Sequence, residues 1–233
     1  MAPFLGKVCI LLTLVAPFCA PNLRAQEGEA KKKSANNLKM LALGLINYAD
    51  ANKNQLPLAA TIGKDRKPLL SWRVQILPYI DEDKLFKSFK LDEPWDSAHN
   101  KKLIEKMPKV FEPVAGKTKE KHATHYQALV GGGAAFFAPG KGVTRYPASF
   151  MDGTSNTILI VEAADAVPWT KPVDLTYDPK KPLPKFGGLF KDGFHAVFAD
   201  GFVRFIGKDA DKDTLRAAIT AAGGEVIDFG KLK

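Results

Sequence analysis

The sequence predicts an α+β fold in which N-terminal helices pack on an antiparallel sheet, followed by a C-terminal hairpin and helix. Apolar residues recur at helical spacing from residue 34 to about residue 107. Strand-like runs separated by glycine and Asp-Gly turns dominate from about residue 122. Helices and strands segregated along the chain in this way are typical of α+β domains.

Residues 1–25 have the pattern of a secretory signal peptide. Lys7 precedes an apolar stretch from Val8 to Ala20, and small residues follow. This stretch has 13 residues, whereas a membrane-spanning helix needs about 20. We expect cleavage after Ala25, export to the periplasm or the exterior, and no stable transmembrane anchor after cleavage. The alternatives are an uncleaved anchor and a lipoprotein modified at Cys19.

The composition restricts the chemistry of the mature chain. Both cysteines, Cys9 and Cys19, lie in the leader, so a chain that starts at Gln26 has no disulfide, thiolate nucleophile or cysteine metal site. The net charge of +9 falls to +7 without the leader, with 32 cations against 25 anions. The lysines are scattered among acids, as on a solvated surface, although acidic polysaccharide or lipid head groups also suit such a chain. We expect no nucleic-acid partner, because no aromatic-basic motif is present.

A charged linker, residues 26–33, is expected to precede a single domain formed by residues 34–233. The domain begins with a helix that Ser34 or Asn36 caps and that residues 52–54 end. Its broad apolar stripe predicts packing against another element. The stripe consists of Leu38, Leu41, Ala42, Leu45, Tyr48 and Ala49.

Further helical segments are expected before the strands begin. Residues 71–89 form helical pieces that Pro78 breaks or kinks. Asp96 or Ser97 is placed to cap a helix from Ala98 to Met107, which Pro108 ends.

The second half of the chain predicts strands, one long loop and a closing helix. Strands are expected after His122 and over Thr157–Glu162. Residues 167–188 contain five prolines and form an extended surface loop that Trp169 and Tyr177 are available to pin. The closing helix is predicted to have Asp213 as its cap, to end at Gly223–Gly224, and to bury an apolar stripe of Leu215, Ala218, Ile219 and Ala222.

The stretch FHAVFADGFVRFI, residues 194–206, carries apolar residues on both sides of Asp200-Gly201. A two-residue Asp-Gly connection favours a tight hairpin turn, and a metal-ligand role for Asp200 is the alternative. Because both faces are apolar, we expect a central hairpin covered by helices on at least one side.

Four patterns that suggest chemistry are better explained by structure. The glycines at 131–133 lack the lysine and Ser/Thr of a phosphate loop, so a turn is expected. His122 and His125 have no third metal ligand at a recognisable spacing. Asp152, Ser155 and Glu162 do not form a nucleophile elbow with a base.

The fourth pattern is the alternation of Asp209, Asp211 and Asp213, which resembles the start of a calcium loop. Thr214 and Thr220 stand where that loop needs glycine and glutamate, so helix capping is the better interpretation. We therefore expect no catalytic residue, no cofactor and no metal site.

Five blocks occur in an order that resembles a known family: NNLKMLALGLINYADANKNQLP, SWRVQILPYIDEDKLFKSF, MDGTSNTILIVEAAD, FADGFVRFI and TLRAAITAAGGEVI. The family is domain of unknown function 1559, which is expanded in planctomycete bacteria, and the resemblance spans about residues 34–228. Its motif residues correspond here to Asp152, Gly153, Thr154, Ser155, Asn156, Thr157, Glu162, Asp200 and Gly201.

The resemblance implies a pseudopilin-like, prepilin-processing-associated domain without known enzymatic activity. This chain departs from the family twice. An ordinary signal peptide replaces the prepilin leader and its spine helix, which places assembly into a fibre in doubt. Phe190 occupies the position of the family's histidine, and His195 stands where asparagine is common.

Two classes of function follow. The leading hypothesis is an exported non-enzymatic domain that binds or assembles with an envelope protein or polysaccharide. The rival is an extracellular carbohydrate-active or solute-binding protein, with Trp72, Trp95 and Trp169 as a carbohydrate platform. Burial of these tryptophans would favour a structural role.

Overall fold

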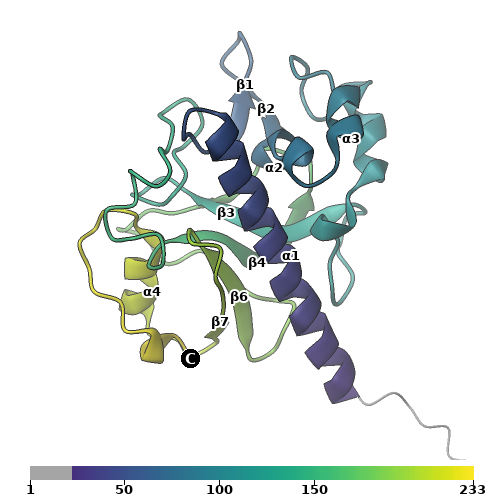
Figure 1. Ribbon diagram of the computed structural model, residues 1–233. Coiled ribbons are helices and arrows are strands. Elements are labelled where there is room, and N and C mark those ends of the chain that lie inside the picture. Colours follow the sequence, from purple (N-terminus) through teal and green to yellow (C-terminus); the bar gives the residue numbers. More distant parts are fainter. Residues whose placement is uncertain (1–22) are drawn as a thin grey trace, which may run out of the picture.

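A computed structural model describes residues 23–233, so nearly all of the predicted signal peptide lies outside the described residues. The fold is α+β, as predicted. Helix α1 (Leu23–Ala51) runs across one face of a five-stranded sheet, and helix α4 (Lys212–Ile219) lies near the C-terminus (Figure 1). The apolar residues of α1 and α4 belong to two separate core clusters, each shared with strand residues, so the sheet lies between two helical layers.

The sheet has the strand order β5-β3-β4-β6-β7. It is antiparallel except for the short pairing of β3 with β5. The strands are β3 (Ala123–Val130), β4 (Ile158–Pro168), β5 (Leu175–Thr176), β6 (Gly193–Phe198) and β7 (Val203–Gly207). The strand expected over Thr157–Glu162 therefore continues six residues beyond Glu162, and its neighbour β6 is buried along its whole length.

Short elements connect α1 to the sheet. The hairpin β1 (Ala60–Ile62) and β2 (Pro68–Ser71) leads into α2 (Trp72–Gln75) and η1 (Leu77–Tyr79), and α3 (Asp83–Ser88) follows. The predicted break at Pro78 is confirmed, since α2 ends before it and η1 is a 3₁₀ turn. The helix predicted over Ala98–Met107 is instead a 3₁₀ segment, η2 (Asn100–Lys106), followed by η3 (Lys109–Phe111).

Helix α1 begins earlier than predicted. Residues 26–33 are helical rather than the charged linker that was predicted, because alanine, glutamate and lysine favour a helix and continue its register. Ser34 is consequently not a cap. It lies inside α1 and is fully buried, and its hydroxyl is used in a tertiary contact described below.

The C-terminal elements correct two further predictions. Asp211, not Asp213, caps α4, because its carboxylate accepts a hydrogen bond from Thr214 N at 2.8 Å. The helix ends at Ile219, so Ala222 is exposed beyond it and Gly223–Gly224 do not terminate it. A last 3₁₀ turn, η4 (Phe229–Leu232), lies against α4.

The hairpin around Asp200 is present but is not central. Strand β7 is the edge of the sheet, and only β6 lies inside it. The connection has three residues, because Phe198 N donates to Phe202 O across the turn and Gly201 takes a φ of +82°. This is the type I turn with a left-handed glycine that often closes hairpins.

The loop predictions hold. Gly131, Gly132 and Gly133 all have positive φ and form a turn, which Gly131 N closes by donating to Phe136 O at 2.8 Å. Trp169 is buried near the start of the proline-rich loop and Tyr177 near its middle, and both pin the loop to the core. Among the helices that the structure describes, none is long and apolar enough to cross a membrane.

Candidate functional site

The Asp152–Thr157 segment joins separate parts of the C-terminal half. The Asp152 carboxylate accepts hydrogen bonds from Gly223 N at 2.7 Å and Gly224 N at 2.8 Å. Gly153 has a φ of +96°, which only glycine adopts without strain, and Thr157 Oγ1 donates to its carbonyl at 3.2 Å. Asn156 Nδ2 donates to the Asp152 carbonyl at 2.7 Å. This segment holds the chain that follows α4.

The same segment fixes the hairpin. Ala199 N donates to Thr157 O at 2.8 Å, and Asp200 N donates to Thr154 O at 3.1 Å. The Asp200 carboxylate accepts from Phe202 N at 2.8 Å, within its own turn. This contact is the turn chemistry expected for the Asp-Gly pair. Ser155 lies in the turn between Gly153 and Asn156.

The Asp152 contacts lead to a prediction. In Asp152→Ala the two glycine amides lose a charged acceptor, so the free energy of unfolding should fall by about 1–2 kcal/mol. Urea denaturation measures this change, and limited proteolysis should show faster cleavage between residues 222 and 228. Glu120→Ala, which removes an exposed carboxylate, is the matched control. Equal stability of the two variants would contradict the assigned role.

Glu162 is the centre of a buried polar cluster formed with Ser34, Tyr126 and His195, and its side chain is 0 % exposed. Its carboxylate accepts hydrogen bonds from the Ser34 hydroxyl and from His195 N, the latter at 2.6 Å. His195 Nδ1 lies 3.2 Å from Glu162 Oε1. The Ser34 hydroxyl also lies 2.9 Å from Tyr126 Oη, so the cluster joins α1 to β3, β4 and β6.

The cluster combines a serine, a carboxylate and a histidine, but not in the arrangement of a hydrolase triad. In a triad the serine hydroxyl bonds to the imidazole, which the carboxylate orients. Here the Ser34 hydroxyl bonds to Glu162 itself, and His195 is packed between the rings of Phe190 and Phe205. The arrangement suits a buried structural network.

Phe190, in the position of the family's histidine, thus contacts His195 directly: their ring centroids lie 5.6 Å apart. Lys31 of α1 covers this aromatic group, with its ammonium 4.6 Å from the Phe205 ring centroid and 2.5 Å from Asp192 Oδ2. Lys31, in the third turn of α1, therefore attaches this part of the helix to the β6–β7 edge of the sheet through both charge and packing.

Because of Tyr126, the free energy of unfolding should depend measurably on pH in the alkaline range. Burial raises the pKa of Tyr126 to about 12 from its ordinary value of 10.0. Below pH 10 the Tyr126 phenol is protonated in both the folded and the unfolded chain, so its ionisation does not change the free energy of unfolding. As the pH rises from 10 to 12 the unfolded chain ionises first, so the free energy of unfolding should fall by about 2–3 kcal/mol in total.

Denaturation at pH 9, 10, 11 and 12 tests this expectation. Tyr126→Phe removes the ionising group and keeps the ring, so its stability should fall less steeply over the same range. Tyr48 and Tyr146, whose pKa values are also raised by burial, contribute to the pH dependence of stability too. Both proteins contain these two residues, so their contribution cancels in the comparison. Parallel curves for the two proteins would show that Tyr126 does not cause the loss.

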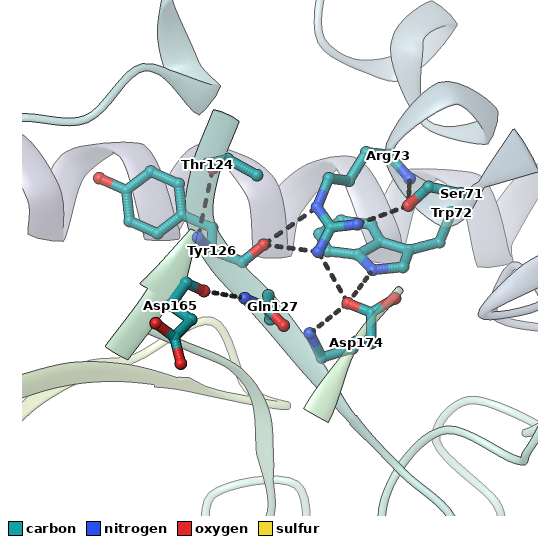
Figure 2. Close-up of polar contacts among 9 residues, drawn as sticks. Ser71, Trp72, Arg73, Thr124, Tyr126, Gln127, Asp165 and Asp174 are labelled. Carbon is teal, nitrogen blue, oxygen red and sulfur yellow. Dashed lines mark hydrogen bonds and ion pairs between the residues drawn. The ribbon is translucent and has the colours of Figure 1, made fainter. Parts of the chain in front are cut away.

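A second buried polar centre is the ion pair between Arg73 of α2 and Asp174, just before β5 (Figure 2). Arg73 Nη2 lies 2.7 Å from Asp174 Oδ1, and the two side chains are 0 % and 4 % exposed. Asp174 Oδ1 also accepts from Trp72 Nε1 at 3.1 Å and from Ala128 N at 2.9 Å. Burial raises the pKa of the Asp174 carboxyl, and the Arg73 guanidinium opposes this rise.

Arg73 is itself completely hydrogen-bonded in place. Its Nε and Nη2 donate to Tyr126 O at 3.0 and 2.9 Å, and its Nη1 donates to Ser71 Oγ at 2.6 Å. Figure 2 shows these donors converging on β3 from α2. The centre thus fixes α2 and the proline-rich loop to the same strand.

One side of this centre opens on a cavity of about 230 Å³. Asp174 belongs to the cavity wall, and the rest of the wall consists of small aliphatic residues and one threonine: Ala59, Val130, Pro139, Pro172, Val173 and Thr176. A concave surface that is mainly apolar and contains few fixed polar groups is typical of small-molecule sites. Sequence reasoning missed this site, and the only signal was a single aspartate between Val173 and Leu175.

The proposed tryptophan platform is wrong. Trp72 and Trp169 are each 0 % exposed, and Trp169 packs between Phe89 and Phe111. Trp95 is only partly buried and lies under the Lys171 ammonium at 5.3 Å. Two of the three rings therefore present no face to a ligand.

The histidines considered as metal ligands have different surroundings from those a metal site needs. His125 Nδ1 lies 2.8 Å from Ala163 O, and His122 occupies a turn with a φ of +56°. Within residues 23–233 no group of three or more histidine, cysteine or acidic side chains is placed to hold a metal ion.

Residues 29–115 match a family described as "Protein of unknown function (DUF1559)". The match covers α1 from residue 29 onward and the short elements up to η3, including the first two of the five sequence blocks. It ends before the Asp152–Thr157 segment. No curated protein and no solved structure matches the chain significantly.

Proposed function

Because residues 29–115 match the DUF1559 family, we propose that this chain is an exported, non-enzymatic, pseudopilin-like domain that binds or assembles in the cell envelope. The observation that carries the proposal is the shape of α1. Its first turns extend beyond the body of the molecule at the end next to the leader (Figure 1). The chain thus holds its N-terminal end away from the folded domain.

The burial pattern of α1 supports this interpretation. Its second half is anchored in the core by Leu38, Leu41, Ala42, Leu45 and Ala49, which are all 0 % exposed. Its first half is exposed at residues 24–27. On the outer face of the anchored half, Met40 and Leu43 remain 46 % and 40 % exposed. Residues three apart lie on one helix face, so these two form a small apolar contact surface.

The polar centres support a non-enzymatic role. Glu162 and Asp152, the acids first considered for catalysis, are hydrogen-bonded to groups that hold elements together. The rival function, solute or carbohydrate binding, loses its tryptophan platform but gains the cavity at Asp174. Binding of a small ligand is compatible with a place in the envelope.

Export is tested by expressing the full chain in a Gram-negative host, fractionating the cells and sequencing the N-terminus. We expect envelope or medium fractions to contain a chain that starts at Gln26. Leu12→Arg, which places a charge in the apolar stretch, should block export, whereas Lys101→Ala should not. A cytoplasmic chain that retains Met1 would overturn the proposal.

Assembly is tested with a photo-cross-linking residue at position 40 or 43 of the exported chain, with position 101 as the control. We expect adducts to a second copy or to an envelope protein from positions 40 and 43 only. Equal adducts from all three positions, or none from any, would contradict assembly through α1.

A further inference from the structure

The Asp174 carboxylate presents its two oxygens to different surroundings. Oδ1 accepts from Trp72 Nε1, Arg73 Nη2 and Ala128 N. Oδ2 has no hydrogen-bond donor among the residues that the structure describes, and in Figure 2 it points away from these three donors. The side chain is only 4 % exposed and belongs to the wall of the 230 Å³ cavity. Oδ2 is not among the buried unsatisfied atoms and therefore keeps contact with solvent, so a hydroxyl that enters the cavity can replace water as its donor.

We propose that this cavity is a binding site for a small neutral ligand that carries hydroxyl groups, such as a single sugar ring or a cyclic polyol, with one hydroxyl donating to Asp174 Oδ2. The inference rests on the proposed binding role of the chain and specifies its ligand class. Three observations select this class: the rigidity of the acceptor, the charge of the centre and the character of the walls.

Rigidity comes from the three donors on Oδ1. They hold the carboxylate from α2 and β3 at once, so it need not reorganise when a ligand binds. Thr176, also in the cavity wall, offers a hydroxyl that both donates and accepts. A ligand with neighbouring hydroxyl groups matches such a pair of polar partners.

Charge excludes ionic ligands. Arg73 already compensates Asp174 at 2.7 Å, so an ammonium group would bring an uncompensated cation into a buried site of a chain with a net charge of +9. A carboxylate or phosphate would approach the Asp174 oxygen directly and be repelled. A neutral hydroxyl donates a hydrogen bond without changing the charge balance.

The walls define the rest of the ligand. Pro139, Pro172 and Val173 present aliphatic surface on which the C–H face of a ring can pack. The volume of about 230 Å³ is below the roughly 300–1,000 Å³ of sites for drug-sized ligands. The site therefore accommodates one ring and not a polymer segment.

Calorimetry and thermal shift on the purified chain test the proposal with defined probes. The neutral probes are glucose, galactose, N-acetylglucosamine and myo-inositol, and the charged probes are glucosamine and glucuronate. We expect at least one neutral probe to bind with a Kd of 1 mM or lower, and the charged probes to bind at least tenfold more weakly. No neutral binding, or tighter binding of a charged probe, would overturn the proposal.

Substitutions locate the binding. Val173 is 40 % exposed at the cavity wall, so Val173→Trp fills the cavity from outside and should weaken binding at least tenfold with an unchanged Tm. Val226→Trp, at a residue that is 96 % exposed and absent from the cavity wall, should bind as the unaltered chain does. Asp174→Asn should also weaken binding, and Val173→Trp keeps the test valid if Asp174→Asn does not fold. Binding that survives Val173→Trp would place the ligand elsewhere.

The result of the ligand-binding experiment does not depend on the result of the export experiment. Failure of the neutral probes with a correctly processed chain refutes this ligand class and leaves the envelope proposal standing. A cytoplasmic chain that still binds a neutral sugar refutes the envelope proposal and leaves the site in place.

Discussion

Arg73→Ala is expected to lower the free energy of unfolding by about 3–5 kcal/mol, the range observed when one partner of a buried ion pair is removed. The loss is large because Asp174 remains as a carboxylate that is 4 % exposed and has lost its cation. Tyr126 O also loses both of its donors from the guanidinium. Urea or guanidinium denaturation monitored by tryptophan fluorescence measures the change.

An exposed ion pair serves as the matched control, because it shows the effect of losing a charge pair without the effect of burial. Lys87 and Asp83 are 2.5 Å apart, but their side chains are 72 % and 52 % exposed, so Lys87→Ala should leave the midpoint of denaturation nearly unchanged. The double variant Arg73→Met with Asp174→Leu removes both buried charges and should recover at least about half of the loss, because apolar replacements of a whole pair are often tolerated. A single variant as stable as the double variant would contradict this account.

Glu162→Leu is expected to cost about 2–4 kcal/mol. The substitution leaves His195 N and the Ser34 hydroxyl without their acceptor inside the core, and each buried unsatisfied donor costs about 1–3 kcal/mol. Glu162→Gln retains one carbonyl acceptor and should cost less. Glu120→Leu, at an exposed glutamate, controls for the change in residue type.

A double-mutant cycle tests whether the cluster acts as a unit. If Ser34 and Glu162 are coupled, the cost of Glu162→Leu should be smaller by about 1 kcal/mol or more in a Ser34→Ala background. Costs that add within experimental error would contradict the coupling of Ser34 to Glu162.

The sequence predicted the elements that depend on local pattern. The stripe from Leu38 to Ala49, the break at Pro78 and the Asp-Gly turn at Asp200 are each determined by neighbouring residues, and the structure has them. The DGTSNT segment was also recognised as turn chemistry. Which elements its amides and carboxylate join could not be foreseen, because the partners of Asp152 lie 71 and 72 residues away.

The incorrect predictions share one physical cause: contacts between residues far apart in the sequence determine these features. Ser34 has the side chain of a helix cap, but the Glu162 carboxylate accepts its hydroxyl and the helix continues through it. The hairpin was expected at the centre because Phe202 and Phe205 are apolar. Phe202 is instead 60 % exposed, because the long-range strand order places β7 at the edge of the sheet.

The Asp174 cavity could not be predicted for the same reason. In the sequence, Arg73 is one cation within an apolar helical segment, and Asp174 is one acid in a proline-rich loop. The two residues are separated by 101 positions. Nothing in either segment specifies the other as its partner. The parallel pairing of β5 with β3 and the hydrogen bond from Ser71 N to Thr170 O place the loop beside α2.

The Glu162 cluster also sets an order of folding. Ser34 is 128 residues from Glu162 in the sequence, and His195 is a further 33 residues along. Helix α1 is therefore among the first segments to leave the ribosome and among the last to find its place, since its polar partners are synthesised much later. Contacts of such sequence separation slow folding, and this cluster can be completed only after His195 has been synthesised.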